Sequence, residues 1–492
     1  MRLLRLLDGL DEIQAQGAGN PECVGLAYDS RRVTPGKVFF ALPGENTDGL
    51  EFAADAIDRG AVAIVAERKM DAVAGTEWIL VPSARRALAQ AASVYYDGPS
   101  KNLKIVGVTG TNGKTTVAYM VRHLLRQAGV STGMLGTVEY DLGNRIFPAT
   151  RTTPEALELQ HLLAQMRDAG CKACVMEVSS HALAQCRVDG VDFDAAVFTN
   201  LTQDHLDYHG DMVSYFETKA SLFEFVDRRE PPGLAILNVD DEHALSLVPR
   251  LTGKPLLYGT SSRAAVRGTG LQPAADGTLF DLNLRGDISR VRLPLIGRHN
   301  IHNALAAAGV ALELGLESKV IREGLESMPP VPGRLESVVA GQPFVVLVDY
   351  AHTDDALRAV LKALRDDTSG RLIVAFGCGG NRDAGKRWLM GEAAGLLADE
   401  VIITTDNPRR EDPAEIARQI GSGFKSVRGE AVEIELDRAR AIDEIIRRAR
   451  PGDTVLIAGK GHETCQEIGE TVMPFDDREH ARATLAALGY GE

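Results

Sequence analysis

The chain has 492 residues, of which 25% are charged and 45% hydrophobic, and its formal net charge is −14. This length exceeds what one hydrophobic core supports, so we expect several domains. The acidic balance disfavours nucleic acid as a partner, because a phosphate backbone favours a basic surface.

Hydropathy and cysteine usage both indicate a cytoplasmic protein. The apolar start at Met1–Leu7 is interrupted by Asp8 before the hydrophobic segment of a signal peptide can form, and no apolar span long enough to cross a membrane follows. The six cysteines are scattered along the chain, which is typical of reduced thiols. We therefore expect no membrane partner, and we expect a monomer.

Two breaks in the sequence predict three domains. Asp97-Gly-Pro-Ser100 precedes an apolar strand, and Met328-Pro-Pro-Val-Pro-Gly333 carries three prolines. The predicted domains therefore cover residues 1–97, 98–332 and 333–492. In the last domain, short apolar strands alternate with helical patterns, which indicates a parallel sheet covered by helices. The predicted strands cover residues 344–349, 371–377, 400–405 and 453–459.

A phosphate-binding loop is predicted near residue 110. The apolar strand Lys104–Val108 leads into Gly110-Thr-Asn-Gly-Lys-Thr-Thr116, and apolar residues then recur at helical spacing. In such a loop, backbone N–H groups approach phosphate oxygens, Lys114 reaches the terminal phosphates, and the Thr115 hydroxyl is placed for Mg²⁺. Val108 stands where the usual pattern has its first glycine. The alternative is a glycine turn ahead of an ordinary surface helix.

Polar residues follow the next two predicted strands. Glu177 lies near the end of the strand Cys174–Val178 and is a candidate Mg²⁺ ligand; the alternative is a salt-bridged residue at a sheet edge. The strand 195–200 leads into a loop that holds His205, and an imidazole binds either a cation or a polar substrate. A polar loop with a helix-capping aspartate explains the same pattern.

Lys219 lies in the middle of the apolar stripe of a predicted helix, Met212–Val226. A buried ammonium must lose its charge, find a partner or be modified, because its desolvation is costly. Snorkelling, a salt bridge to a carboxylate and carbamylation by CO₂ are all open. Only carbamylation would turn this lysine into an anion able to hold Mg²⁺.

These motifs resemble the Mur ligases of peptidoglycan synthesis, which are ATP-dependent, amide-forming enzymes with three domains. The resemblance spans nearly the full length and also rests on Glu177–His181, Thr199–His205, Gly297–Asn303 and Asp349–His352. It implies an α/β fold with a small α/β N-terminal domain, a P-loop central domain with a mostly parallel sheet, and a Rossmann-like C-terminal domain.

The resemblance also implies a role for individual residues. The catalytic residues would be Lys114, Glu177, His205 and Lys219. Mg²⁺ would be held by Thr115, Glu177, His205 and a CO₂-derived carbamate on Lys219. ATP would be bound by Gly110, Thr111, Asn112, Gly113, Lys114, Thr115, Thr116, Asn303, Arg334 and Asp349. A UDP-N-acetylmuramoyl-dipeptide would be bound at its uridine end by Tyr28, Ser30, Glu45, Asn46 and Thr47, and at its dipeptide end by Thr152, Thr153, Ser179, Gln185 and Arg187.

The loop Asp406-Asn-Pro-Arg409-Arg410 points to the amino acid that is added. Asp412 as a helix N-cap and Pro413 as the first helical residue explain the end of this loop, but not its two arginines. A guanidinium suits a carboxylate and would repel the ammonium of lysine. The resemblance implies meso-diaminopimelate, whose distal end carries a carboxylate and an ammonium. It would be held by Arg382, Asp406, Asn407, Arg409, Gly459 and Glu463.

The expected reaction begins when the D-glutamate γ-carboxylate attacks the γ-phosphoryl group of ATP to give an acyl phosphate. Three rival functions stay open: an L-lysine-adding ligase of the same family, a ligase like folylpolyglutamate synthetase, and a non-catalytic nucleotide-gated binding protein. The first domain and the loop at 406–409 count against the folylpolyglutamate synthetase-like ligase. ATP consumption that depends strictly on the uridine-linked dipeptide would exclude the binding protein.

Overall fold

The computed structural model describes residues 1–44, 47–68, 76–274 and 277–491. Contacts divide the chain into two compact units. The first unit comprises Met1–Leu201, His205–Ala265 and Ala306–Val320, and the second comprises Thr202–Asp204, Val266–Leu305 and Ile321–Glu492. The first unit contains both the N-terminal sheet and the central sheet, so the predicted domain limits at residues 97 and 332 stay predictions.

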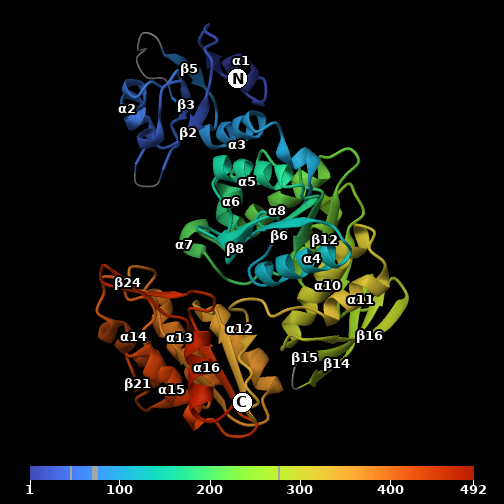
Figure 1. Cartoon of the computed structure of the whole chain (residues 1–492), viewed down its shortest axis with the longest axis vertical. Coiled ribbons are helices and arrows are strands. Elements are labelled where there is room, and N and C mark those ends of the chain that lie inside the picture. Colours follow the sequence, from blue (N-terminus) through green and yellow to red (C-terminus); the bar gives the residue numbers. More distant parts are fainter. Residues whose placement is uncertain (45–46, 69–75, 275–276, 492) are drawn as a thin grey trace. The chain divides into compact units, whose positions relative to one another are not determined.

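The N-terminal sheet has the strand order β1-β5-β4-β3-β2 and is parallel except for β1 (Figure 1). Neighbouring residues in its strands point to opposite faces, so Phe40 packs with α1 and α3 while Phe39 packs with α2. The strands are β1 (Ala15–Gln16), β2 (Gly25–Ala27), β3 (Lys37–Phe40), β4 (Ala63–Ala66) and β5 (Glu77–Leu80), and the helices are α1 (Leu3–Leu7), α2 (Ala53–Asp58) and α3 (Ala84–Tyr95).

The central sheet has the order β13-β12-β11-β6-β10-β7-β8-β9, and its strands are parallel up to β7. Its parallel core confirms the predicted strands before the glycine loop, at Glu177 and before residue 200. The strands are β6 (Lys104–Thr109), β7 (Thr132–Leu135), β8 (Glu139–Asp141), β9 (Ile146–Pro148), β10 (Ala173–Glu177), β11 (Ala195–Phe198), β12 (Leu234–Asn238) and β13 (Leu256–Gly259). The helices are α4 (Lys114–Gln127), α5 (Ala156–Asp168), α6 (Ser180–Ala184), α7 (Leu206–His209), α8 (Met212–Asp227) and α9 (Glu242–Ser246).

The second unit contains an antiparallel meander and the C-terminal sheet. The meander consists of β14 (Val266–Ala274), β15 (Gly277–Leu284) and β16 (Asp287–Leu293), and α10 (Arg298–Glu313) and α11 (Ser318–Glu326) follow it along the chain. The C-terminal sheet has the order β17-β18-β22-β19-β20-β21 and is parallel except for β17. Its strands are β17 (Glu336–Ser337), β18 (Val345–Asp349), β19 (Leu372–Phe376), β20 (Glu400–Ile403), β21 (Glu433–Ile434) and β22 (Thr454–Ala458).

Helices cover both faces of the C-terminal sheet. Leu347, Val374 and Leu456 pack with α12 (Asp354–Asp367), α13 (Gly385–Leu397) and α14 (Pro413–Arg428). The residues beside them, Val346 and Ile373, pack with α15 (Arg438–Arg448) and α16 (Asp477–Ala487). A small hairpin, β23 (Cys465–Ile468) and β24 (Thr471–Pro474), lies after β22. Both faces are therefore buried, which explains why these strands read as continuous apolar runs.

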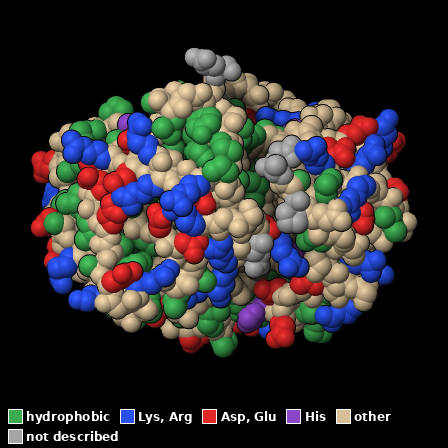
Figure 2. All heavy atoms as spheres, turned by 90° about the horizontal axis from the view of Figure 1, so that it is seen from below, with side chains coloured by type: hydrophobic (Ala, Val, Ile, Leu, Met, Phe, Trp, Pro, Cys, Tyr) green, Lys and Arg blue, Asp and Glu red, His purple; other side chains and the backbone are tan. Residues whose placement is uncertain are grey.

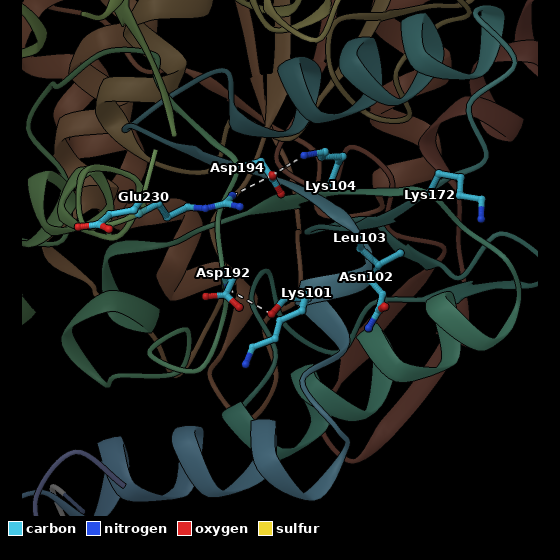
Figure 3. Close-up of a pocket in the computed structure, with 10 residues that line it drawn as sticks. Lys101, Asn102, Leu103, Lys104, Lys172, Asp192, Asp194 and Glu230 are labelled. Atoms are coloured by element: carbon cyan, nitrogen blue, oxygen red, sulfur yellow. Dashed lines mark hydrogen bonds and ion pairs between the residues drawn. The ribbon is translucent and has the colours of Figure 1, made fainter. Parts of the chain in front are cut away.

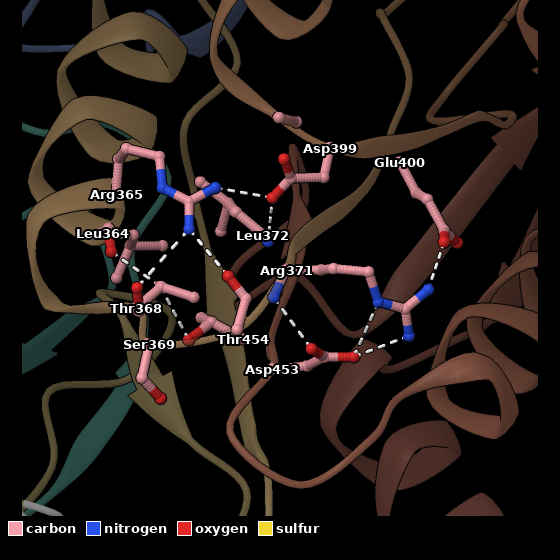
Figure 4. A network of polar contacts seen from close by, with 12 residues as sticks. Leu364, Arg365, Thr368, Ser369, Arg371, Leu372, Asp399, Glu400, Asp453 and Thr454 are labelled. Carbon is pink, nitrogen blue, oxygen red and sulfur yellow. Dashed lines mark hydrogen bonds and ion pairs between the residues drawn. The ribbon is translucent and has the colours of Figure 1, made fainter.

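A network of ion pairs and hydrogen bonds connects the N-terminal ends of three strands in the C-terminal sheet (Figure 4). The guanidinium of Arg371 donates to Asp453 Oδ2 at 2.6 Å and also pairs with Glu400. The backbone N–H of Arg371 donates to the other oxygen of Asp453 at 2.8 Å. These residues immediately precede or begin β19, β22 and β20. The network therefore holds the N-terminal ends of these three strands together.

A hollow of about 560 Å³ lies at the N-terminal ends of β6, β10 and β11 (Figure 3). Asp194 accepts hydrogen bonds there from Lys104 at 3.0 Å and from the backbone N–H of Ile105 at 2.8 Å, and it pairs with Arg229 at 2.8 Å. The glycine loop follows the opposite end of β6. The charged residues of this hollow therefore connect the N-terminal ends of these strands, and they lie at the opposite end of β6 from the glycine loop.

Charges of both signs intermingle on the surface shown in Figure 2. Arg447 and Asp443 form one exposed ion pair, at 2.7 Å. All six cysteines are free thiols. In the part of the chain that the structure describes, every helix is too short or too polar to span a bilayer.

The Arg371–Asp453 pair yields a stability prediction. Burial acts to raise the pKa of Asp453, but its hydrogen bonds from Arg371 outweigh that effect and hold the pKa below its ordinary value. Arg371→Met leaves this buried carboxylate without its guanidinium, so we expect a loss of about 3 kcal/mol. Because the pKa is lowered in the folded state, the difference in unfolding free energy between wild type and variant has its full size above about pH 4. It shrinks as the pH falls further. Thermal unfolding followed by circular dichroism measures it.

The control is Arg447→Met, which removes an exposed ion pair on α15, a helix that packs on the same sheet. This variant should barely change the unfolding midpoint. Equal midpoints for the two variants would contradict a structural role for the Arg371 network.

Candidate active site

The glycine loop between β6 and α4 is held by the end of β11. Gly110 and Gly113 have φ values of 137° and 85°, which side chains rarely allow. The hydroxyl of Thr199 donates to the carbonyl of Asn112 at 2.6 Å. The amide of Asn200 both accepts from Asn112 N–H at 3.0 Å and donates to its carbonyl at 3.1 Å. The loop is thus a rigid turn at a helix N-terminus, the geometry that binds phosphate.

Lys114 folds back over this loop. Its ammonium donates to the carbonyls of Gly110 at 2.9 Å and Thr111 at 2.7 Å. Both acceptors are neutral, so an incoming phosphate oxygen can replace them without leaving a charge unpaired. The ammonium therefore lies over the glycine loop, and its role in binding phosphate stays a prediction.

Glu177 joins three elements around a buried carboxylate. The hydroxyl of Thr115 donates to Glu177 Oε2 at 3.0 Å. Thr137 donates to the same carboxylate through its backbone N–H, at 2.8 Å, and its hydroxyl, at 3.1 Å. Glu177 is only 1% exposed. Its described partners are hydroxyl and amide groups, so a salt bridge at a sheet edge does not describe this residue.

Lys219 is buried in the middle of α8, as the apolar stripe predicted, and is only 1% exposed. This burial excludes snorkelling. The ammonium donates to the carbonyl of Gly110 at 2.8 Å and lies 4.4 Å from the centre of the Tyr215 ring. Lys219 therefore reaches the phosphate loop directly, from a helix more than one hundred residues further along the chain.

His205 belongs to a cluster of imidazole rings beside α6 and α7. Its ring lies 4.8 Å from that of His181, and the ring of His209 lies 5.7 Å from His181. Burial, followed by the neighbouring His205, lowers the pKa of His181 to about 4. Neutral imidazole is the form that binds metals, and His181 is in that form near neutral pH.

These residues fit Mg²⁺ only in part as they stand. Among residues 1–44, 47–68, 76–274 and 277–491, no three His, Cys, Asp or Glu side chains gather to form a metal site. Thr115 and Glu177 supply the oxygen ligands that Mg²⁺ prefers. Lys219 could join them only as an anion, because an ammonium repels a cation. A carbamate on Lys219 would complete such an oxygen-rich set.

The residues expected to bind the dipeptide gather around Arg187. Its guanidinium donates to the carbonyl of Thr153 at 3.0 Å and to Gln185 at 2.6 Å, and it pairs with Glu155 at 3.0 Å. Burial lowers the pKa of Arg187, with Glu155 opposing that effect. The Thr153 hydroxyl donates to that of Ser179 at 3.4 Å, and the hydroxyl of Thr152, the residue before Thr153, contacts that of Thr137 at 3.1 Å. The structure thus brings these five predicted residues together.

The predicted uridine-binding residues lie on the N-terminal domain. The Tyr28 hydroxyl donates to Glu158 of α5 at 3.0 Å, and burial together with this carboxylate raises the pKa of Tyr28. Ser30 is buried in a short 3₁₀ turn, and Thr47 is exposed. Glu45 and Asn46 lie outside the described residues.

The predicted ATP-binding residues of the second unit are only partly brought together. Asp349 ends β18 and accepts from the backbone N–H groups of Leu335 at 2.7 Å and Ala351 at 2.8 Å. Burial nevertheless raises its pKa, against the nearby charge of Arg334. Arg334 lies over the ring of Tyr350 at 5.1 Å. Asn303 instead donates to Asn300 within α10, at 3.0 Å.

The predicted amino-acid residues lie in loops after β19, β20 and β22. Asn407 donates to Glu463 at 2.8 Å, and Asp406 accepts from the backbone N–H of Asn407 at 2.6 Å. Gly459 has φ 111°, and a side chain there would meet Asp406 Oδ2 at 2.6 Å. These four residues therefore share one site at the C-terminal edge of the sheet.

The arginines of this region differ in their surroundings. Arg409 pairs with Glu467 at 2.8 Å and donates to the carbonyl of Gly380 at 3.0 Å. Arg382 is exposed on the loop after β19. Arg410 is also exposed and lies 3.4 Å from Glu470. Asp412 caps α14 and Pro413 begins it, as the sequence predicted.

Sequence reasoning assigned no role to several residues that shape these loops. Arg438 is buried and pairs with Asp477 through two hydrogen bonds of 2.7 Å. It also donates to the carbonyls of Ala458 at 3.0 Å and Thr405 at 3.4 Å, which immediately precede the amino-acid loops. Its only sequence signal is an arginine at the start of an amphipathic helix, and that is an ordinary surface pattern.

Comparisons with known proteins identify the family of this chain. Family models match residues 22–96 (Mur ligase family, catalytic domain), 108–311 (Mur ligase middle domain) and 333–461 (Mur ligase, glutamate ligase domain). A UDP-N-acetylmuramoyl-L-alanyl-D-glutamate–2,6-diaminopimelate ligase from Solibacter usitatus is 48% identical over 95% of this chain and 94% of its own length. The chain belongs to the Mur ligase family. A ligase of the same description from Geobacillus kaustophilus is 45% identical over 99% of this Mur ligase and 100% of its own length.

Solved structures give the same result. A structure described as UDP-N-acetylmuramoyl-L-alanyl-D-glutamate–2,6-diaminopimelate ligase matches with a TM-score of 0.69 and 34% identity, covering 95% of each chain. A folylpolyglutamate synthase from Mycobacterium tuberculosis, complexed with ADP and AMPPCP, has a TM-score of 0.63 at 20% identity and shows the shared fold alone. The protein is thus an ATP-dependent ligase with the predicted three-domain α/β fold.

The contacts of Asn200 yield a second prediction. Asn200→Ala removes two hydrogen bonds that fix Asn112 in the glycine loop, so the KM for ATP should rise about tenfold with a smaller change in kcat. Phosphate release measured against ATP concentration tests this. Thr260→Ala, which removes a 2.8 Å hydrogen bond to Asp240 in another loop, is the control and should leave the KM unchanged. An unaltered KM in the Asn200 variant would show that the loop keeps its shape without this side chain.

Proposed function

We propose that this Mur ligase joins meso-diaminopimelate to the D-glutamate γ-carboxylate of UDP-N-acetylmuramoyl-L-alanyl-D-glutamate, at the expense of ATP. The observation that supports the proposal is the contact between Asn407 and Glu463, in which an amide donor lies beside an acceptor carboxylate, with Arg409 two positions further along the same loop. The distal end of diaminopimelate needs both kinds of partner, and lysine needs only the acceptor. The names of the Solibacter and Geobacillus relatives support the same assignment.

The reaction proceeds in two displacements. An oxygen of the γ-carboxylate attacks the γ-phosphorus of ATP, and ADP leaves as an acyl phosphate forms. The neutral amine of diaminopimelate then attacks the acyl carbon through a tetrahedral intermediate; phosphate leaves with the bonding electrons, and the amine loses a proton. Catalysis of this kind depends mainly on positioning and on neutralising charge.

The chain's own residues perform those two tasks. Backbone N–H groups of the glycine loop and the ammonium of Lys114 bind the phosphates once the lysine leaves the carbonyls of Gly110 and Thr111. Arg187 offers a buried guanidinium to the carboxylates of the dipeptide, in exchange for part of its contact with Glu155. Both exchanges replace an internal partner by an anionic substrate, so no cation is left unpaired.

Mg²⁺ and a carbamate belong to the same proposal. Thr115, Glu177, His205 and carbamylated Lys219 would hold the ion, which supplies positive charge between two anionic reactants. The support comes from the buried Thr115–Glu177 contact and from the burial of Lys219 beside Gly110. Asn303, Arg334 and Asp349 would complete the ATP site. A monomeric, cytoplasmic enzyme that acts on small molecules, without nucleic-acid or membrane partners, completes the proposal.

The choice of amino acid is tested by phosphate release with each candidate. We expect kcat/KM for meso-diaminopimelate to exceed that for L-lysine at least a hundredfold, because Arg409 and Asn407 need a carboxylate to bind. Arg409→Ala should raise the KM for diaminopimelate by a factor of about 30 or more and leave the KM for ATP unchanged.

Three results would contradict this assignment. Equal kcat/KM values for the two amino acids in the wild type would indicate a less selective ligase. Turnover with a folate substrate would indicate a ligase like folylpolyglutamate synthetase. A protein that binds ATP but shows no turnover dependent on the uridine-linked dipeptide would be a nucleotide-gated binding protein.

Carbamylation is tested independently of turnover. Protein equilibrated with ¹³C-bicarbonate should give a carbamate carbon signal by NMR, and Lys219→Gln should lack it. Lys104→Gln, which removes an exposed lysine from the same unit, is the control and should keep the signal. Identical spectra for wild type and Lys219→Gln would rule out the modified lysine.

A further inference from the structure

Lys460 is a buried cation to which neither the sequence motifs nor the mechanism assigns a role. It lies between two glycines with positive φ, Gly459 at 111° and Gly461 at 54°, in the turn after β22. Its side chain is 0% exposed, while that of the neighbouring Glu463 is 29% exposed. The cation therefore lies behind the carboxylate, and a ligand entering the amino-acid site meets Glu463 first.

The ammonium of Lys460 contacts two residues of the proposed amino-acid site. It donates to Asn407 Oδ1 at 3.0 Å and to Glu463 Oε2 at 2.9 Å. Asn407 Nδ2 donates to the same Glu463 oxygen at 2.8 Å, so the three side chains form a closed triangle. The backbone N–H of Glu467 also donates to Asn407 Oδ1, at 3.0 Å.

This triangle decides which way the Asn407 amide faces. Two donors, Lys460 and the backbone of Glu467, point at one end of the amide, which must therefore be the oxygen. The NH₂ end then faces Glu463 and keeps a second N–H beyond that bond. Asn407 is thereby fixed as a hydrogen-bond donor toward the site.

The same triangle sets what Glu463 offers. Its Oε2 already accepts from Lys460 and Asn407, whereas its Oε1 accepts no hydrogen bond from the described residues, and the side chain is 29% exposed. One acceptor oxygen therefore stands beside one amide donor. A ligand that carries an ammonium and a carboxylate on one carbon matches both, whereas a simple amine matches only the carboxylate oxygen.

We propose that Lys460 is a specificity-determining positioning residue, which selects a zwitterionic amino-acid end by orienting Asn407 and by offsetting the charge of Glu463. This inference rests on the proposed function and deepens it. Without the Lys460 charge, the site gains one net negative charge, and the Asn407 oxygen keeps only the backbone N–H of Glu467 as a donor. The added negative charge repels the ligand carboxylate, and the less firmly held amide binds it more weakly, whereas neither change penalises the ammonium of lysine.

The test is a competition between meso-diaminopimelate and L-lysine in one reaction, with both products quantified by mass spectrometry. This measures the ratio of the two kcat/KM values directly. Lys460→Met keeps the length of the side chain and removes its charge. We expect this ratio to fall about tenfold or more, through a higher KM for diaminopimelate and with kcat changed less than about threefold. The KM for ATP should stay the same.

Arg371→Met is the matched control, because it breaks a buried ion pair at the other end of the same strand β22. It should lower the thermal midpoint without altering the ratio. A fall of the ratio in both variants would show that Lys460 acts only through stability. An unchanged ratio in both variants would show that Lys460 does not affect specificity. Either result would overturn the proposal. Lys460→Gln, which keeps a donor but no charge, is the substitute if the methionine variant does not fold, and the same fall is expected.

The outcome also separates this inference from the proposed function. A wild-type enzyme that shows no preference for diaminopimelate refutes the proposed function. A wild-type preference that persists unchanged in the Lys460 variants refutes the role of Lys460 and leaves the function in place.

Discussion

Buried cations that reach the C-terminal ends of parallel strands are the constraint on which both halves of this protein depend. An ammonium or guanidinium taken out of water must find acceptors, and Lys219, Arg438 and Lys460 each find at least one in a loop that follows a strand. Lys219 thereby fixes the glycine loop at Gly110, and Arg438 and Lys460 fix the loop that follows β20. The loops of the site are therefore positioned by buried side chains rather than by surface contacts.

The sequence predicted the framework well because its signals are local. The strand, glycine loop and helix around Lys114 follow from apolar spacing and from glycines, and the structure confirms all three. The burial of Lys219 followed from its place in the apolar stripe of α8, and the cap at Asp412 followed from a short motif. Parallel topology then required the loops after β18, β19, β20 and β22 to share one edge.

The partners of these residues could not be predicted, because they depend on contacts between distant segments. Glu177 accepts from Thr137, forty residues away, and no pattern near either residue links them. Arg438 pairs with Asp477 thirty-nine residues further on, and it reads as a surface residue until the two helices are packed. Arg409 pairs with Glu467, and no local pattern predicts this ion pair, because it arises where the hairpin β23–β24 packs against that loop.

The C-terminal sheet separates stability from specificity along the length of its strands. At the N-terminal ends of the strands, Arg371 pairs with both Asp453 and Glu400, so this network has little capacity left to bind a ligand. At the C-terminal ends of the strands, Arg438 pairs with Asp477, and Lys460 donates to Asn407 and to the partly exposed Glu463. The loops at the C-terminal ends can therefore carry different side chains, while the ion pairs at the N-terminal ends keep the strands in register.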